Sequence, residues 1–349
     1  MLISVIIPVY NTPPDRLLRC LNSILSGDTA ELEVILVDDG SQQFLSAQYQ
    51  KICRTYKKVQ YYRQENSGPA LARNYGVEKA HGEYAAFVDA DDYVSKQCFS
   101  QAQTIIAQYQ PDLVIGLVKK CDGNDHTALN HCQTEPLEIQ IFTEERERAV
   151  LLGHMLGSTD TSLLYSNGYF RDGPVAKVFR REIFLKVPFD EKSFWNEDTI
   201  WNMRLMKVCE TIIVCKEAWY AYSVYNQSLT QGYRENCMEE FLIRTQQEYE
   251  VMNQYWPDNL EGVYVRIWHD IFLLCRALVF HPNNHMSRRE KASLIKRAIQ
   301  SENYQIALKN ISFNYPQNRI KRWGKEFLRL SMRKGWYPLC YLIVKYTLK

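Results

Sequence analysis

Short apolar runs alternate with helical patterns over the first part of the chain, and this alternation limits the fold more than any other feature. Four runs have the composition of strands, and the first is almost entirely apolar, as a strand covered on both faces is: 2–9, 33–37, 59–63 and 84–88. Gly27 and Gly82 end two of the intervening helical patterns. Four alternations in about 90 residues predict an open α/β sheet.

Polar clusters follow three of these runs, at 10–11, 38–39 and 89–92. Ligands of open α/β sheets bind beyond the carboxyl ends of the strands. We therefore expect the three clusters to line one rim of the sheet. The alternative interpretation is that three solvated turns fall at strand ends by chance.

The third cluster is the most acidic, because Asp89, Asp91 and Asp92 follow the apolar run directly. Charge of this density costs too much free energy to bury unpaired. Two carboxylates one residue apart can share a hard cation such as Mg²⁺ or Mn²⁺, with a phosphate completing its shell. A solvated, Asp-rich turn is the alternative, and the stretch alone does not decide between them.

Length and composition limit the domain organisation, the partners and the location that we expect. With 349 residues the chain exceeds what one core usually serves, so we expect one large domain plus an appendage. The net charge of +2 gives no reason to expect a nucleic-acid partner. The first residues lead straight into a strand pattern without a signal-peptide signature, and the ten cysteines are scattered without a C-x-x-C pair. No run of about 18 apolar residues occurs, so we expect a cytoplasmic protein without a membrane-spanning helix.

A second candidate site lies further along the chain. The segment 173–185 has a helical pattern with the basic residues Lys177, Arg180 and Arg181, and strand-like runs follow at 211–215 and 219–225. Between them, the Glu197–Asp198 pair begins a helical pattern. Acidic residues suit the first turn of a helix, and one of them can also act as a general base at the rim.

The polar segment 121–138 is predicted to be a surface insertion. It holds Cys121, His126, His131 and Cys132, whose spacing matches no zinc pattern that we consider reliable. We prefer the exposed-loop interpretation. From about residue 235 the pattern changes to long helices without a recognisable catalytic motif.

The tail, 329–349, combines aromatic, aliphatic and basic residues. This composition suits the headgroup layer of an anionic membrane. A terminal helix packed on the domain, or a contact in a homodimer, explains the same composition.

Four motifs in order resemble the nucleotide-sugar domain of family 2 glycosyltransferases, which have the GT-A fold. They are SVIIPVYN at 4–11, VILVDDGS at 34–41, GPALARNYG at 68–76 and FVDADD at 87–92. The resemblance covers residues 1 to about 120 well. The segment 173–230 resembles the acceptor half of bacterial members that build capsule, exopolysaccharide or lipopolysaccharide.

The resemblance implies a mixed sheet with helices on both faces. It divides the chain into a GT-A domain, 1–232, and a helical C-terminal region with a basic and aromatic tail, 233–349. Within the GT-A domain, 1–120 would be the nucleotide-sugar half and 121–232 the acceptor half.

The implied reaction is an inverting transfer from a nucleotide sugar, most often a UDP-sugar, to a hydroxyl of a growing glycan or lipid-linked acceptor. The lack of a signal-peptide signature and the basic, aromatic tail predict a location in the cytoplasm or at the inner face of the cytoplasmic membrane. The site residues carried over by position are Pro8, Tyr10 and Asn11 around the base, Asp39 on the uracil edge, Arg73 at the diphosphate, Asp89 on the ribose or sugar side, Asp91 on Mn²⁺ or Mg²⁺, Asp198 as the base, and Lys177 and Glu197 on the acceptor side.

The chain also departs from the family pattern. It lacks the Gln-x-x-Arg-Trp motif of processive synthases, which implies single or limited additions. A third, histidine ligand for the metal has no clear counterpart.

A dehydrogenase is disfavoured because no Gly-x-Gly-x-x-Gly follows the first strand, and a P-loop enzyme because Gly-x₄-Gly-Lys-Ser/Thr is absent. The remaining alternative is a catalytically inactive scaffold, although the full set of site residues argues against it.

Overall fold

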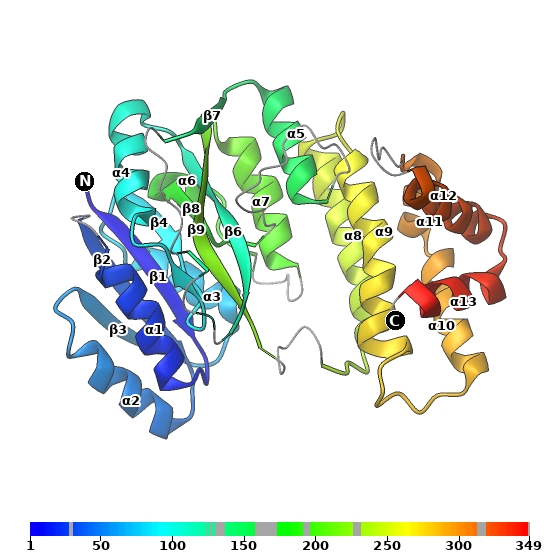
Figure 1. Cartoon of the computed structure of the whole chain (residues 1–349), viewed down its shortest axis with the longest axis horizontal. Helices are drawn as coiled ribbons and strands as arrows, with labels where there is room; N and C mark the ends of the chain where they lie inside the picture. Colours follow the sequence, from blue (N-terminus) through cyan, green and yellow to red (C-terminus); the bar gives the residue numbers. More distant parts are fainter. Residues whose placement is uncertain are drawn as a thin grey trace. The chain divides into compact units, whose positions relative to one another are not determined.

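The computed structural model describes residues 1–27, 31–123, 125, 128–129, 137–157, 173–190, 196–225, 232–312 and 319–347. The chain divides into two compact units, which Figure 1 shows and which we describe separately. The first comprises Met1–Arg148 and Tyr165–Tyr225, and the second comprises Ala149–Leu164 and Asn226–Lys349. The domain boundary expected at 232/233 stays a prediction, because residues 226–231 lie outside the described part.

The described residues of the first unit form a nine-stranded mixed sheet in the order β3-β2-β1-β4-β8-β6-β9-β5, with β7 also paired to β9. The strands β3, β2, β1 and β4 run parallel, and β8 runs antiparallel between β4 and β6. The strands are β1 (Ile3–Val9), β2 (Leu32–Asp39), β3 (Val59–Gln64), β4 (Tyr84–Phe87), β5 (Tyr93–Val94), β6 (Leu113–Asp122), β7 (Ile139–Phe142), β8 (Lys177–Arg180) and β9 (Ile212–Val224).

Helices cover both faces of this sheet. Alternate residues of β1, such as Val5 and Ile7, join one core with Leu17, Tyr49 and Phe99 from the helices of that face. On the other face, Ile6 of β1 packs against α3, and Phe87 of β4 packs against α6 and α7. The helices of the first unit are α1 (Pro14–Leu25), α2 (Gln43–Cys53), α3 (Pro69–Glu78), α4 (Cys98–Tyr109), α6 (Arg181–Lys186) and α7 (Glu197–Val208). The helix α5 (Glu145–Met155) begins in the first unit and continues into the second.

The second face is closely packed. A Cβ atom at Gly76 of α3 would lie 2.3 Å from Cγ2 of Ile6 in β1, so α3 approaches the sheet at a residue without a side chain. Phe87 of β4 packs its ring 5.6 Å from that of Phe184 and 5.8 Å from that of Trp201, measured between centroids. This packing holds α3 against β1, and α6 and α7 against β4.

The helix predicted over 173–185 was wrong in its first half. Residues 177–180 form β8, and the helix α6 begins only at Arg181. Phe179 pairs with Ala85 of β4 on one side and Leu113 of β6 on the other, so this segment is a strand inside the sheet. Buried β-branched and aromatic residues favour that environment over a short helix. The two predicted strands at 211–215 and 219–225 are likewise one strand, β9.

The second unit is helical, as the sequence predicted. Its helices are α8 (Cys237–Tyr255), α9 (Glu261–Leu274) with a π-helical continuation η2 (Cys275–Val279), α10 (Arg288–Gln300), α11 (Glu302–Asn310), α12 (Arg319–Arg333) and α13 (Tyr337–Thr347). Among the described residues, none of the helices combines the length and the apolar character that crossing a bilayer requires.

The predicted insertion, 121–138, is described only in part. Cys121 ends up buried in β6. The residues His126, His131 and Cys132 lie outside the described residues, so the zinc alternative has no structural description.

Candidate active site

The loops that follow β1 and β2 are hydrogen-bonded to each other. The Asn11 N–H donates to Ser41 Oγ at 3.0 Å, and the Gln42 N–H donates to Asn11 Oδ1 at 2.9 Å. Asn11 has φ 50°, a left-handed conformation that asparagine adopts more readily than most residues. Beside this link, Pro8 is half-buried and the Tyr10 side chain is exposed, so a flat ring stands open at the rim.

Asp39, at the end of β2, holds the loop before α3. Its Oδ1 accepts from Gln64 Nε2 at 2.8 Å and from the Ser67 N–H at 2.9 Å, and its Oδ2 accepts from the Gly68 N–H at 2.9 Å. A carboxylate offers about four acceptor positions, so Asp39 has room for one further donor from a ligand. Asp38 is different, because its buried carboxylate is used by Ser41, Ser46 and Tyr61 inside the fold.

Arg73 joins two segments that are far apart in the sequence. Its guanidinium lies on α3 and is almost wholly buried. Nη2 donates to Asp89 Oδ1 at 2.9 Å, and Nη1 lies 3.8 Å from Glu197 Oε1. The structure therefore brings together the end of β4 and the start of α7 around one cation.

Asp91 and Asp92 have different surroundings although they are neighbours. Burial and the Asp89 charge raise the pKa of Asp91, whose backbone oxygen accepts from the Tyr225 hydroxyl at 3.3 Å. The Asp92 carboxylate points into the fold and accepts from the Tyr220 hydroxyl and the Ser223 N–H, each at 2.7 Å. Burial, then the charges of Asp89 and Asp91, raise the pKa of Asp92 well above its usual range. Asp92 thus ties the acidic loop to β9.

Removing the hydroxyl of Tyr220 should destabilise the protein. The change Tyr220→Phe leaves the buried Asp92 carboxyl group short of one hydrogen bond, which costs about 1–3 kcal/mol. The same hydroxyl accepts from the Asp89 N–H at 3.2 Å, so the acidic loop loses a second contact. Urea unfolding followed by tryptophan fluorescence measures the change, with Tyr109→Phe as the control at a more exposed tyrosine. A midpoint equal to that of the control contradicts this structural role.

An arginine that the sequence analysis did not select holds the acidic loop, residues 89–92, in place. Arg19 of α1 donates through Nη2 to the backbone oxygen of Asp91, to Ser223 Oγ at 3.0 Å and to the Tyr225 hydroxyl at 2.7 Å. Arg16, one helical turn earlier, has its guanidinium carbon 3.5 Å from the centroid of the Tyr225 ring. The i, i+3 spacing of two arginines after the first polar cluster was the available signal.

The Glu197–Asp198 pair begins α7, where a helix N-terminus favours negative charge. Burial, then the neighbouring Asp198 charge, raise the pKa of Glu197 to about 7, against the opposing effect of Arg73. Asp198 is half-buried, and its Oδ1 accepts from the Thr199 N–H at 2.7 Å, which orients the side chain. A carboxyl group that titrates near neutral pH and a second one fixed beside it suit proton transfer.

Lys177 lies at the start of β8, next to the end of β4. Its side chain is buried, and Nζ donates to the backbone oxygen of Gly173 at 2.6 Å. This contact is structural, so the acceptor-side role expected for Lys177 stays a prediction.

A metal site made by the protein alone is not evident. Within the described ranges, no group of three or more His, Cys, Asp or Glu side chains is placed to hold an ion. The oxygen donors of Asp89 and Asp91 nevertheless fit a cation such as Mg²⁺, which is usually bound by one or two carboxylates with substrate phosphates and water. Burial, and then repulsion by the Asp89 carboxylate, raise the pKa of Asp91, and a bound cation would relieve that repulsion.

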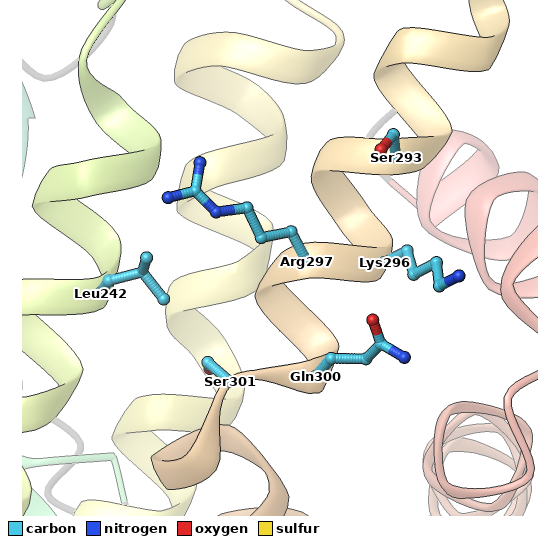
Figure 2. Close-up of a pocket in the computed structure, with 6 residues that line it drawn as sticks. All are labelled: Leu242, Ser293, Lys296, Arg297, Gln300 and Ser301. Atoms are coloured by element: carbon cyan, nitrogen blue, oxygen red, sulfur yellow. The ribbon is translucent and has the colours of Figure 1, made fainter.

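The second unit has a pocket of about 480 Å³ between α8, α10 and the start of α11 (Figure 2). Its two cationic side chains extend in opposite directions. Arg297 pairs with Glu239 at 3.3 Å, and Lys296 lies 5.7 Å from the ring of Tyr337. Because both cations are engaged and no acidic cluster lines the pocket, the rim of the first unit is the better candidate for catalysis.

Comparisons with known proteins agree with this choice. EpsJ of Bacillus subtilis is 28% identical over 70% of this chain and 68% of its own length. YibD of Escherichia coli K12 is 25% identical over 80% of both chains. GlyA of Streptococcus pneumoniae is 24% identical over 68% of this chain, which spans only 32% of GlyA. Each of the three is described as a glycosyltransferase, the first two as uncharacterised ones.

Solved structures match the fold over nearly the whole chain. The crystal structure of Staphylococcus aureus TarS 1–349 has a TM-score of 0.61 and 18% identity, and covers 99% of this chain and 90% of that one. The same protein in complex with UDP-GlcNAc has a TM-score of 0.62. The likeness confirms the predicted GT-A-like fold with a helical C-terminal region.

The family model for "Glycosyl transferase family 2" matches residues 4–182, just over half of the chain. The matched span contains the rim clusters after β1, β2 and β4, together with Arg73 of α3. The chain therefore belongs to glycosyl transferase family 2 and is a glycosyltransferase.

Proposed function

We propose that the chain transfers a sugar, with inversion, from a UDP-sugar to a hydroxyl of a growing glycan or lipid-linked acceptor in bacterial surface-polysaccharide synthesis. The observation that carries the proposal is Arg73, which holds Asp89 of the acidic loop and Glu197 of α7 within one site. Sugar transfer needs a cation near the diphosphate of the donor and a carboxylate near the hydroxyl of the acceptor. Arg73 and the two carboxylates beside it supply both kinds of group in one site.

On the donor side, the base would lie between Tyr10, Pro8 and the Asn11 turn. The remaining acceptor position of Asp39 suits the N–H on a uracil edge. Arg73 would face the diphosphate, where negative charge develops as the anomeric C–O bond breaks. Asp89 would then contact the ribose or sugar hydroxyls, since its Oδ1 is shared with Arg73. The TarS complex with UDP-GlcNAc supports a uridine nucleotide as the first choice.

Asp91, with Asp89 beside it, would hold the divalent cation, Mn²⁺ or Mg²⁺. Bound there, the cation would supply positive charge against the diphosphate oxygens. The contacts of Arg19 and Tyr225 with the Asp91 backbone oxygen keep the loop in place and leave the Asp91 carboxylate for this task.

Asp198 would take the proton of the acceptor hydroxyl, which is a poor nucleophile until it is deprotonated. Attack from the face opposite the diphosphate inverts the anomeric centre, so no enzyme nucleophile is required. Lys177 and Glu197 would border the acceptor, with Glu197 next to Arg73. The lack of the processive motif supports single or limited additions.

The proposed location is the cytoplasm, at the inner face of the cytoplasmic membrane, with the tail 329–349 in contact with anionic lipid. A homodimer contact through the same tail is the alternative. No nucleic-acid partner is proposed.

The proposal is tested by UDP release from a panel of UDP-sugars with Mn²⁺, Mg²⁺ or EDTA. We expect slow hydrolysis of one donor, with water replacing the acceptor, and its loss in EDTA. The heat-denatured protein is the control for spontaneous hydrolysis. If no UDP-, GDP- or dTDP-sugar is turned over, even with lipid-linked acceptors present, the inactive-scaffold alternative replaces the proposal.

A further inference from the structure

Helix α12 carries three large apolar side chains on its outer face. Trp323, Phe327 and Leu330 are 73%, 51% and 46% exposed. Their spacing of four and three residues puts them on one side of the helix, one above the other. Trp336, just beyond the helix, is 53% exposed. Single exposed apolar residues are ordinary, whereas a contiguous group of this size marks an interaction surface.

The other side of α12 already fixes the helix in the second unit. Leu328, Ser331 and Met332 are buried, and the Tyr304 hydroxyl lies 3.7 Å from Met332 Sδ. The outer face is therefore not needed to hold α12 in place.

Helix α13 differs from α12. The sequence analysis left its aromatic run open between a membrane contact, a packed terminal helix and a homodimer contact. Tyr341 and Val344 are buried, and the Tyr341 ring packs 5.2 Å from that of Phe280. Much of that run is therefore used inside the second unit, as the packed-helix alternative required. The exposed apolar surface lies mainly on α12.

The sequence that forms α12 and α13 is strongly basic. The sequence from 319 to 347 has one acidic residue, Glu326, which pairs with Arg329 at 2.8 Å. The exposed cations Arg333 and Lys334 follow the apolar stripe directly. The Lys and Arg residues of this segment are Arg319, Lys321, Arg322, Lys325, Arg329, Arg333, Lys334 and Lys345.

We propose that the outer face of α12, defined by Trp323, Phe327, Leu330, Arg333, Lys334 and Trp336, docks on an anionic lipid bilayer. Aromatic and aliphatic side chains enter the headgroup boundary, and the flanking cations are attracted to anionic headgroups. A second copy of the chain is a poorer occupant, because a two-fold contact would bring together two copies of the same face, each with Arg333 and Lys334. The proposal specifies the membrane contact of the proposed function and does not rest on the catalytic assignments.

Vesicle sedimentation tests the proposal with the full chain. We expect it to sediment with vesicles of equimolar phosphatidylcholine and phosphatidylglycerol, and at least 10-fold less with phosphatidylcholine alone. Raising NaCl from about 0.1 to 0.5 M should weaken the binding, because salt screens exposed charges. The triple variant Trp323→Ser, Phe327→Ser, Leu330→Ser should bind at least 10-fold more weakly. Phe44→Ser, at a residue that is 71% exposed on α2, is the matched control and should bind as the wild type does.

Several results would overturn the proposal. They are no binding to anionic vesicles, equal binding to neutral vesicles, or unchanged binding of the triple variant. If sedimentation velocity shows that the wild type is a dimer and the triple variant a monomer, the face instead binds a second copy of the chain. If circular dichroism shows that the triple variant is unfolded, the double variant Arg333→Gln, Lys334→Gln replaces it. Wild-type binding of this double variant to anionic vesicles would contradict the proposed role of the two cations. UDP release should persist in the vesicle-binding variants, so a failure of the catalytic proposal is recognised separately.

Discussion

Replacing Asp91 by asparagine is expected to slow metal-dependent UDP release by on the order of 10³-fold, which corresponds to about 4 kcal/mol in the activation barrier. The variant keeps the side-chain volume but removes the charged oxygen pair proposed to hold the cation. The loop should stay in place, because Arg19 and Tyr225 contact the backbone oxygen of Asp91 and not its carboxylate. Initial rates of UDP release at increasing Mn²⁺ concentration measure the effect.

The matched control is Glu83→Gln, at an exposed carboxylate just before the same strand, β4. It should release UDP at the wild-type rate. Circular dichroism of Asp91→Asn should match the wild type. If Asp91→Asn turns over the donor normally and keeps the same Mn²⁺ dependence, Asp91 is not the metal ligand.

The sequence was most informative where local patterns act alone. The strands β1, β2, β3 and β4 and the helices between them follow from apolar runs bounded by glycine, proline and polar residues. Short links between these elements leave few ways to arrange them, so the parallel half of the sheet was predictable.

The antiparallel half was not predictable in the same way. Residues 177–180 look helical by spacing, but they form β8 because β4 and β6 offer hydrogen-bond partners on both sides. Those partners lie about 65 to 95 residues away in the chain, and no local pattern reports such pairing.

The site shows a similar division. The resemblance selected Arg73, Asp89, Glu197 and Asp198, and the structure holds them at one rim, although their catalytic roles stay predictions. The support for the acidic loop was missed, because Arg19 and Tyr220 reach Asp91 and Asp92 only through the folded sheet. A sequence motif identifies the residues that contact a ligand. It says much less about the distant residues that hold those side chains in place.

The Asp198→Asn variant is expected to lose about 10²- to 10⁴-fold in donor turnover while keeping UDP affinity. Asparagine keeps the shape and can still accept from the Thr199 N–H, but it cannot take a proton from an attacking hydroxyl or water. UDP binding by calorimetry and UDP release from the identified donor measure the two quantities separately. Glu210→Gln, at an exposed carboxylate beyond the other end of α7, is the matched control.

The carboxyl group of Glu197, next to Asp198, is a second candidate for the base, and the same measurements distinguish the two. Glu197, with its pKa raised to about 7, has the better-matched proton affinity, but its Oε1 lies 3.8 Å from Arg73, on the side proposed for the diphosphate. Glu197→Gln removes one of the two carboxylates paired with Arg73 and should therefore change donor binding more than it slows the turnover of bound donor. If Glu197→Gln instead abolishes turnover while Asp198→Asn keeps it, the base is Glu197. The same result would place the acceptor hydroxyl within hydrogen-bond reach of Glu197, because a base must lie that close to the proton that it removes.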